Sequence, residues 1–377
     1  MSRKPGAALF GGLSPLRGVV KDWDGFETLA IPLAGAEVLK GLKKGRPVSA
    51  GQKLARNPRP LKGDIHAPVD GWLEEINEIE IVLRRDEQAV GEPPEPLDLK
   101  NLDGPALAGA LKSLGLNLPD IPPGDPVIIS ALSPEPGLLL APALFGEHRE
   151  TLLAGAEAAG RLWPERDFIW AVAKEGQAPK DRRMILLPES YPAGLPALVK
   201  KALTGRRDPW GRGVLGSREL YFLGRLWRTG RPLLRLPLTL GSSNYFVPLG
   251  ARIIDLLRFA NMLPGPDDLV ISGGLVRGRS LARLQRGLGP EASALHLAKG
   301  RARPQPFDPC RRCGRCRRAC PVGLEVDAFG SRPPAEWLKA NLHSLAGCLL
   351  CGNCALACPS RRPLLSLARL AARREEP

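Results

Sequence analysis

The residues of this chain best suited to chemistry are its cysteines. All eight lie between positions 310 and 358. They form two runs with the same spacing, C-x2-C-x2-C-x3-C-P, which end at Pro321 and Pro359. Three thiolates two residues apart can wrap around three corners of an iron–sulfur cube, and the fourth points away to a neighbouring cube. The spacing therefore predicts two cubane clusters with interleaved ligands.

The same rule assigns a ligand set to each cluster. One [4Fe–4S] cluster takes Cys310, Cys313, Cys316 and Cys358. The second takes Cys348, Cys351, Cys354 and Cys320. Gly314 and Gly352 hold the same place in each run, where a residue without a Cβ lets the backbone curl around sulfur. Two clusters packed in this way carry single electrons, so the region is expected to act in electron transfer.

Zinc and disulfides are the ordinary alternatives for clustered cysteines. Zinc quartets usually consist of two separated CxxC pairs rather than four cysteines within eleven residues. Disulfides are disfavoured in a reducing compartment, and such tight spacing would strain them. The repeated run therefore favours iron.

The first run is also strongly basic, whereas the second has no arginine between its cysteines. Its five arginines are Arg311, Arg312, Arg315, Arg317 and Arg318. Residues 301–377 hold 14 Lys and Arg against 6 Asp and Glu, a net +8 of the chain's +15. One interpretation is a solvated basic loop. The other is a docking face that steers an acidic partner and raises the potential of the nearby cluster. Leu349 and Leu350 would then mark the buried end of the route.

Length and composition set the broad class. At 377 residues, the chain is longer than one core normally organises, so we expect two to four domains. Aromatic residues make up only 5% and no nucleic-acid motif is present, so nucleic acid is not an expected partner. No secretory signal and no apolar run of about 18 residues is visible. We therefore expect a cytoplasmic protein that reaches a membrane only through other subunits.

Residues 14–90, after a tail of residues 1–13, read as a β domain. ETLAIPL and GWLEEINEIEIVL have the character of strands. GRPVSAGQKLA followed by HAPVDG is typical of the biotinyl/lipoyl-like barrel-sandwich. A carrier of this type would present a modifiable lysine at a hairpin tip, and Lys62 is available there. It lacks the usual flanking methionines, so a structural sandwich is favoured. His66 is expected to be a packed structural histidine.

The middle of the chain alternates strand-like and helix-like stretches. In residues 97–230, DPVIISAL, DFIWAVA and RRMILLP are short apolar runs, and HRETLLAGAEAAGRLW and GLPALVKKALTG favour helices. This alternation predicts an α/β domain with a largely parallel sheet. Residues 231–300 are β-rich, with an amphipathic helix expected at Ala251–Phe259. Residues 301–377 form the cysteine-bearing domain and end in a basic helix.

The order of these parts resembles the C subunit of the Rnf-type electron-transport complex. The resemblance covers nearly the whole chain and is carried by FGGLSP, GRPVSAGQKLA, HAPVDG, ALSPEPG, SYPAGLPALVKKALTGR, VPLGARIIDLL, ISGGLVRG and both cysteine runs. It implies a multidomain α/β and β fold. The expected parts are a barrel-sandwich hybrid domain, a Rossmann-like α/β domain, a β-grasp (SLBB-like) unit and a C-terminal α-helical dicluster ferredoxin domain.

The resemblance also implies an FMN and NADH site in the α/β domain, but the sequence departs from the family there. The family's glycine-rich phosphate loop is replaced by GPALAGALKSLGLNLP, which keeps only Gly104, Gly109 and Gly115. ALSPEPG keeps Glu135 alone of the family's acidic residues. Since phosphate cradles depend on glycines, these changes disfavour FMN.

The favoured function is an electron-transfer iron–sulfur subunit of a membrane-associated redox complex of the Rnf type. Its partners would be membrane-embedded or peripheral redox subunits that present an acidic face, on the inner face of the cell membrane. The alternative is an active NAD(P)H:flavin oxidoreductase with its own clusters, as in a flavin-containing cobalamin reductase, which shares this architecture. The four histidines are scattered, so no hydrolytic site is expected.

Overall fold

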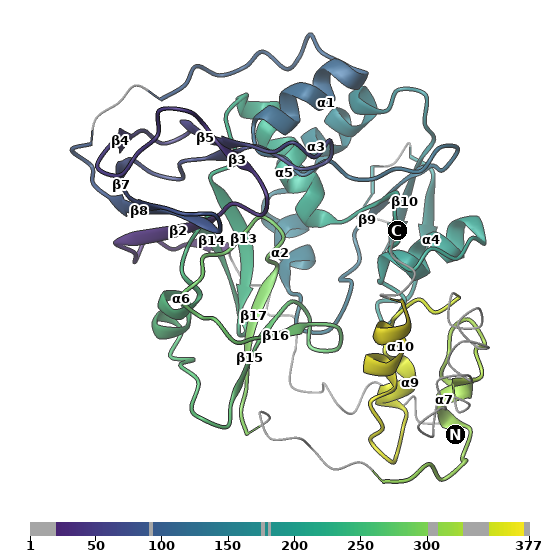
Figure 1. Ribbon diagram of the computed structural model, residues 1–377. Coiled ribbons are helices and arrows are strands. Elements are labelled where there is room, and N and C mark those ends of the chain that lie inside the picture. Colours follow the sequence, from purple (N-terminus) through teal and green to yellow (C-terminus); the bar gives the residue numbers. More distant parts are fainter. Residues whose placement is uncertain are drawn as a thin grey trace.

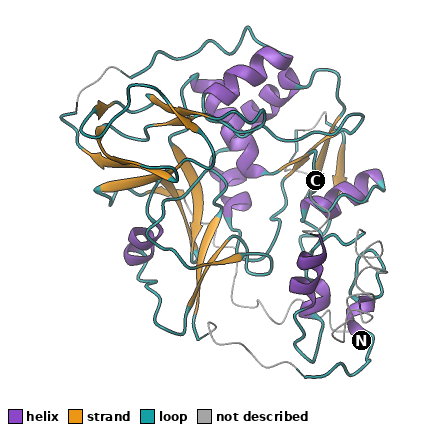
Figure 2. Cartoon of the chain, in the orientation of Figure 1, coloured by secondary structure: helices purple, strands orange, loops and turns teal. Residues whose placement is uncertain are grey.

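The computed structural model describes residues 20–89, 93–174, 178–179, 182–300, 308–326 and 347–372. Within them the chain is a mixed α/β protein with four sheets. Figures 1 and 2 show the strands gathered in two groups, with the short helices of the cysteine-bearing region at one end of the molecule. Among the described residues, none of the helices is both long and apolar enough to cross a membrane.

The N-terminal β domain consists of two small antiparallel sheets. The four-stranded sheet runs β2 (Thr28–Pro32), β8 (Glu80–Arg85), β7 (Gly71–Ile76) and β4 (Pro47–Val48). The three-stranded sheet runs β3 (Glu37–Val38), β5 (Lys53–Arg56) and β6 (Ile65–His66). The stretch GWLEEINEIEIVL forms a hairpin rather than one strand. Its turn is fixed by the Asn77 side-chain oxygen, which accepts the backbone N–H groups of Ile79 and Glu80 at 2.9 Å each.

The α/β domain is built on a parallel four-stranded sheet, as the alternation predicted. The strand order is β11 (Met184–Leu186), β10 (Phe168–Val172), β9 (Val127–Ser130) and β12 (Val214–Leu215). The helices of this part are α1 (Gly104–Ser113), α2 (Leu140–Glu147), α3 (Arg149–Leu162), α4 (Pro196–Thr204) and α5 (Ser217–Thr229). Helix α4 ends at Gly205, whose left-handed φ of 69° closes the last turn.

Two glycines let helices α3 and α5 pack with their backbones in contact. A Cβ on Gly155 would lie 2.0 Å from the Leu220 carbonyl oxygen. A Cβ on Gly224 would lie 1.8 Å from the Thr151 carbonyl oxygen. Both distances are far below van der Waals contact, so neither position accepts a side chain without moving the helices apart.

The third part is a six-stranded sheet of order β1-β14-β13-β17-β15-β16. Its later strands are β13 (Arg235–Leu240), β14 (Ser243–Pro248), β15 (Leu269–Ser272), β16 (Arg279–Leu281) and β17 (Ala294–Ala298). Helix α6 (Ile253–Phe259) follows β14, close to the range expected from the sequence. Strand β1 (Val20–Asp22) pairs in parallel with β14, so the chain contributes to this sheet before it enters the N-terminal β domain.

The cysteine-bearing region contains three helices in its described residues. They are α7 (Arg315–Arg318), α9 (Asn353–Leu356) and α10 (Leu364–Ala372). Its small core includes the buried side chains of Cys316, Val326 and Leu364. In Figure 1 this region lies beside α4 of the α/β domain. His343 and the tail after Ala372 lie outside the described residues.

Candidate iron–sulfur centres

The two cysteine runs adopt the same backbone path. When Cys310 is aligned with Cys348, three left-handed positions of the first run recur in the second, and the pairs are Arg312 and Leu350, Gly314 and Gly352, and Gly323 and Arg361. Helices α7 and α9 start directly after the middle pair. Non-glycine residues avoid this conformation unless the surroundings enforce it, which is common at functional loops. Both runs are therefore shaped for the same task.

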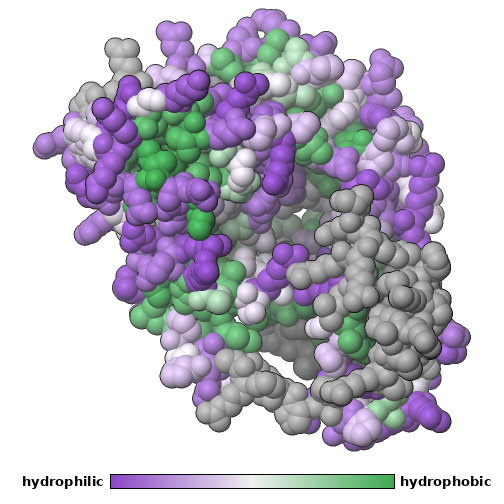
Figure 3. All heavy atoms as spheres, viewed as in Figure 1, coloured by the Kyte–Doolittle hydropathy of each residue, from purple (hydrophilic) through white to green (hydrophobic). Residues whose placement is uncertain are grey.

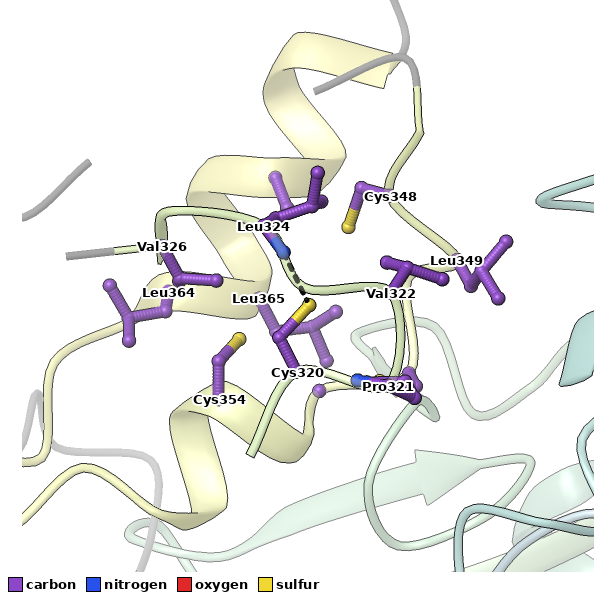
Figure 4. Close-up of a pocket in the computed structure, with 13 residues that line it drawn as sticks. Cys320, Pro321, Val322, Leu324, Val326, Cys348, Leu349, Cys354, Leu364 and Leu365 are labelled. Carbon is purple, nitrogen blue, oxygen red and sulfur yellow. Dashed lines mark hydrogen bonds between the residues drawn. The ribbon is translucent and has the colours of Figure 1, made fainter. Parts of the chain in front are cut away.

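Each run contributes to two pockets. The first pocket is lined by Cys310, Cys313, Cys316 and Cys358, together with Arg311, Gly314, Pro359 and Ser360. The second pocket is lined by Cys320, Cys348, Cys351 and Cys354, together with nine further residues, most of them apolar. Their empty volumes, including space open to solvent, are about 290 Å³ and 450 Å³. In Figure 4 the labelled cysteine sulfurs point toward one shared space.

This grouping places the fourth cysteine of each run beside the first three of the other. Cys320 closes the first run and lines the second pocket, whereas Cys358 closes the second run and lines the first. The pockets thus group the cysteines in the same way as the ligand sets expected from their spacing. All eight cysteines are free thiols.

Backbone N–H groups point at the sulfur atoms. The Arg312 N–H lies 3.4 Å from the Cys310 sulfur, and the Leu324 N–H lies 3.3 Å from the Cys320 sulfur (Figure 4 draws the latter). Such donors favour thiolate, the form that ligates iron.

Burial makes the second-pocket thiols poor acids by themselves. It raises the pKa of Cys348, raises the pKa of Cys351 to about 11, and raises the pKa of Cys354 to about 12. Buried thiolates without a cation would be unstable here, and a bound metal supplies the positive charge that keeps sulfur deprotonated. The donor set therefore fits an iron–sulfur cluster.

Among the described residues, no group of three or more His, Cys, Asp or Glu side chains is placed to hold a metal ion. A cubane cluster asks for a different arrangement, because each of its four irons takes one thiolate at a separate corner.

The first pocket is lined by exposed cysteines and is surrounded by positive charge. Cys310 and Cys313 are exposed, and so are all five arginines of the run. Arg311 pairs with Asp308 and Arg317 with Glu325, each at 3.2 Å. The guanidinium groups of Arg312 and Arg315 have no hydrogen bond or ion pair with any described residue. The run therefore presents positive charge beside exposed sulfur ligands.

The second pocket is lined mainly by apolar side chains. Leu349 and Leu350 are 1% and 5% exposed, in agreement with the buried end expected from the sequence. Leu349 forms a small core with Val322 and with Ala197 of α4. The second pocket therefore adjoins the α/β domain.

Sequence reasoning missed the polar contacts that reach the second pocket from the α/β domain. The Tyr191 hydroxyl donates to the Cys351 carbonyl oxygen, and the Lys201 ammonium donates to the Pro321 carbonyl oxygen at 2.8 Å. Burial raises the pKa of Tyr191 above its usual range, so its hydroxyl keeps its proton. The partners of these two bonds are far apart in the sequence, and no local pattern signals them.

Comparison with known proteins supports the assignment of the cysteine region. Residues 305–361, which contain all eight cysteines, match the 4Fe-4S dicluster domain family. The match supports 4Fe–4S clusters as the cofactors of this region.

Curated relatives extend the similarity into the rest of the chain. The C subunit of the ion-translocating oxidoreductase complex of Edwardsiella ictaluri is 28% identical over 78% of this chain and 44% of its own length. The proteins of the same name from Buchnera aphidicola and Yersinia pestis are 22% and 27% identical, over 63% and 58% of this chain. The chain is a homologue of these C subunits. It spans 56% and 40% of the Buchnera and Yersinia proteins, about half the length of the curated relatives it matches.

A solved NAD+-reducing [NiFe]-hydrogenase in its H2-reduced state aligns with 74% of this chain and 65% of its own. The identity is 15% and the TM-score 0.39, a likeness too low to bear on fold or function.

The segment where the resemblance implies a flavin-phosphate loop does not have the geometry of a cradle. Gly104 and Gly109 lie in helix α1, and a Cβ on either would meet no atom within 4 Å. Gly115 turns the chain after that helix, against the Asp64 carbonyl. The Glu135 carboxylate accepts the Arg277 N–H at 2.8 Å and is occupied within the protein. Gly109 has its N–H inside a regular helix, so this N–H does not have the close backbone approach to a phosphate that the family's loop requires.

Lys62 and His66 have structural surroundings. Lys62 pairs with Glu291, and its loop is fastened by the Gly63 N–H, which donates to the Asn117 side chain at 3.0 Å. His66 is buried, which lowers its pKa to about 4 and keeps it neutral. These contacts favour a fixed sandwich over a swinging carrier.

Proposed function

We propose that this protein is an electron-transfer iron–sulfur subunit of a membrane-associated redox complex of the Rnf type. The observation that carries the proposal is the crossed grouping of the cysteines, in which each pocket combines three thiols of one run with the fourth of the other. The dicluster family match and the names of the curated relatives support the same function.

The ligands proposed for the first cluster are Cys310, Cys313, Cys316 and Cys358. Those for the second are Cys348, Cys351, Cys354 and Cys320. When bound, the two clusters would supply one-electron redox chemistry. Cys316 lies in helix α7 and Cys320 two residues after its end, and they line different pockets, so the chain holds the two sites next to each other.

The remaining residues give the two ends different roles. With a cluster bound, the apolar side chains around the second pocket would limit the access of water to it. Arg311, Arg312, Arg315, Arg317 and Arg318 form the proposed docking face, where positive charge would steer a redox subunit with an acidic surface. Hydrophilic residues with separate hydrophobic patches between them cover much of the face seen in Figure 3. We place the protein in the cytoplasm, on the inner face of the membrane, through these partners.

We further infer that the α/β domain has lost FMN and NADH binding and serves as a scaffold. The placement of Gly109 inside helix α1, where its N–H belongs to the helix, supports this inference. The proposed domains are a barrel-sandwich hybrid at 14–90, a Rossmann-like domain at 97–230, a β-grasp (SLBB-like) unit at 231–300 and a dicluster ferredoxin domain at 301–377. Strand β1 lies within the first of these ranges but pairs with β14 of the third. In the third, the order β14-β13-β17-β15-β16 with β17 parallel to β13 supports the β-grasp assignment.

Anaerobic purification of the whole chain tests the proposal. We expect about eight iron and about eight labile sulfide per chain, with no flavin released on denaturation. Substoichiometric iron accompanied by zinc would refute the electron-transfer function. A stoichiometric yellow flavin bleached by NADH would refute the scaffold role and favour the oxidoreductase alternative. Pull-down from membranes would then identify the redox subunits.

A further inference from the structure

The backbone carbonyl of the middle cysteine is a matched position in the two runs. Cys313 and Cys351 are equivalent when the runs are aligned on their first cysteines, and each carbonyl oxygen accepts a side-chain hydrogen bond. At Cys313 the donor is Arg318 of the same run, at 3.1 Å. At Cys351 the donor is the Tyr191 hydroxyl of the α/β domain.

The sequence explains why the second run needs an outside donor. The residue equivalent to Arg318 is Leu356, which has no polar side-chain atom. The second run can therefore not make this bond within itself. Tyr191 supplies it from a distant part of the chain.

Other contacts fix the α/β domain against the same loops. Ala197 of α4 packs with Val322 and Leu349. Lys201 and Arg207 donate to the carbonyl oxygens of Pro321 and Val322, at 2.8 Å and 3.3 Å. Val276, whose loop is held by Glu135, lies so close to Gly352 that a Cβ there would approach it to 2.9 Å. Tyr191 is thus presented from a surface that is already held in place.

A donor at this carbonyl affects the cluster that its cysteine ligates. The hydroxyl directs the positive end of its dipole toward the Cys351 peptide, next to the ligand sulfur. Reduction adds negative charge to the cluster, so the donor stabilises the reduced form, and the apolar surroundings of the second pocket strengthen the effect.

We propose that Tyr191 is a positioning residue for the second cluster, which does for the Cys351 loop what Arg318 does for the Cys313 loop. The α/β domain thereby sets the reduction potential of one cluster selectively. This inference rests on the proposed electron-transfer function, because it requires both clusters to be present.

Redox titration of the anaerobically purified whole chain, followed by EPR, tests this role. Tyr191→Phe should shift the midpoint of the second cluster's EPR signal, which depends on Cys354, to a more negative potential. It should leave the first cluster's signal, which depends on Cys316, unchanged. Arg318→Leu should shift only the Cys316-dependent signal. Tyr221→Phe, which removes a phenolic hydroxyl from an aromatic stack with Phe246, should shift neither. The second-site variant Leu356→Arg, combined with Tyr191→Phe, should restore the potential by supplying the donor from within the run.

The outcomes separate this inference from the proposed function. A wild-type chain without clusters would refute the function itself. Clusters present, but unmoved or shifted equally by Tyr191→Phe, would overturn the role of Tyr191 alone. Loss of only the second cluster in Tyr191→Phe would support positioning. Loss of both clusters would support it if Leu356→Arg restores them, and would overturn it if that rescue fails.

Discussion

The two cysteine runs have the same backbone conformation but differ in the side chains between their cysteines and in the exposure of those side chains. Position by position, Arg311 and Arg312 of the first run correspond to Leu349 and Leu350 of the second. The arginines are exposed and the leucines are 1% and 5% exposed. The same ligand geometry is thus offered once to solvent and once to a protein core. The spacing of the cysteines and the character of the residues between them can therefore vary independently. The cysteines form the proposed ligand set, and the intervening residues determine whether it borders solvent or a protein core.

The largest expected effect comes from breaking the crossed ligation. Cys320→Ser should abolish the cluster of the second run, and Cys358→Ser that of the first, each removing about half of the iron. The physical reason is that each fourth thiol lines the pocket of the other run. Iron analysis combined with EPR of each variant checks it. If Cys320→Ser destroyed the cluster held by Cys310, Cys313 and Cys316 instead, each run would hold its own cluster and the crossed ligation would be wrong.

The next effect concerns the matched positions Leu349 and Arg311. Leu349→Ala should destabilise its region by about 2–5 kcal/mol, because it opens a cavity in a buried apolar contact with α4. Arg311→Ala should stay within about 0.5 kcal/mol, because its side chain is 64% exposed. Loss of cluster absorbance during urea unfolding measures both. Equal losses in the two variants would contradict the contrast in burial.

The next expected effect is the pH dependence of the free energy of unfolding that comes from His66, which lies outside both cysteine runs. The folded pKa of His66, about 4, lies below its unfolded value near 6.5, so folding keeps this group neutral. Its contribution to stability is fully present above pH 6.5 and is lost as the pH falls toward 4. Between pH 7 and pH 5 the free energy of unfolding should fall by about 2 kcal/mol through this group.

Urea unfolding of the wild-type chain and of His66→Gln at both pH values checks this expectation. The variant should lose that share of the pH dependence. An identical slope in the two proteins would mean that His66 is not held neutral by burial.

The smallest effect is kinetic and concerns the basic run. Arg312→Gln combined with Arg315→Gln should slow reoxidation by ferricyanide, a small anionic acceptor, by about threefold at low salt and flatten its salt dependence. Lys43→Gln combined with Lys44→Gln removes the same charge from the N-terminal β domain, where both lysines are exposed. Stopped-flow traces of the two double variants form the comparison. Equal slowing would show that net charge acts, rather than charge beside the first pocket.

Much of this site could be predicted from the sequence because its information is local. The spacing within each run groups the ligands, and the apolar Leu349 and Leu350 signal a buried side. The end of helix α4 could also be predicted, because a glycine directly after a helix-forming stretch is a local signal. What could not be predicted depends on distant pairings: strand β1 joins β14, and Tyr191 reaches Cys351, although both pairs are far apart in the sequence. The hairpin inside GWLEEINEIEIVL was not predicted, because the composition of this stretch favours one continuous strand. The only local sign of the turn is Asn77, whose side chain binds the backbone of the next residues.

The central claim is that one ligand geometry is placed in two environments to make a directed route for electrons. Potentiometric titration of the whole chain, followed by EPR and assigned with Cys358→Ser and Cys320→Ser, tests it most directly. Because reduction adds negative charge, the exposed site among arginines should be reduced at a more positive potential than the apolar site. Two signals are expected, with the Cys358-dependent signal appearing first on reduction. A single midpoint for both clusters, or the reverse order, would contradict the account.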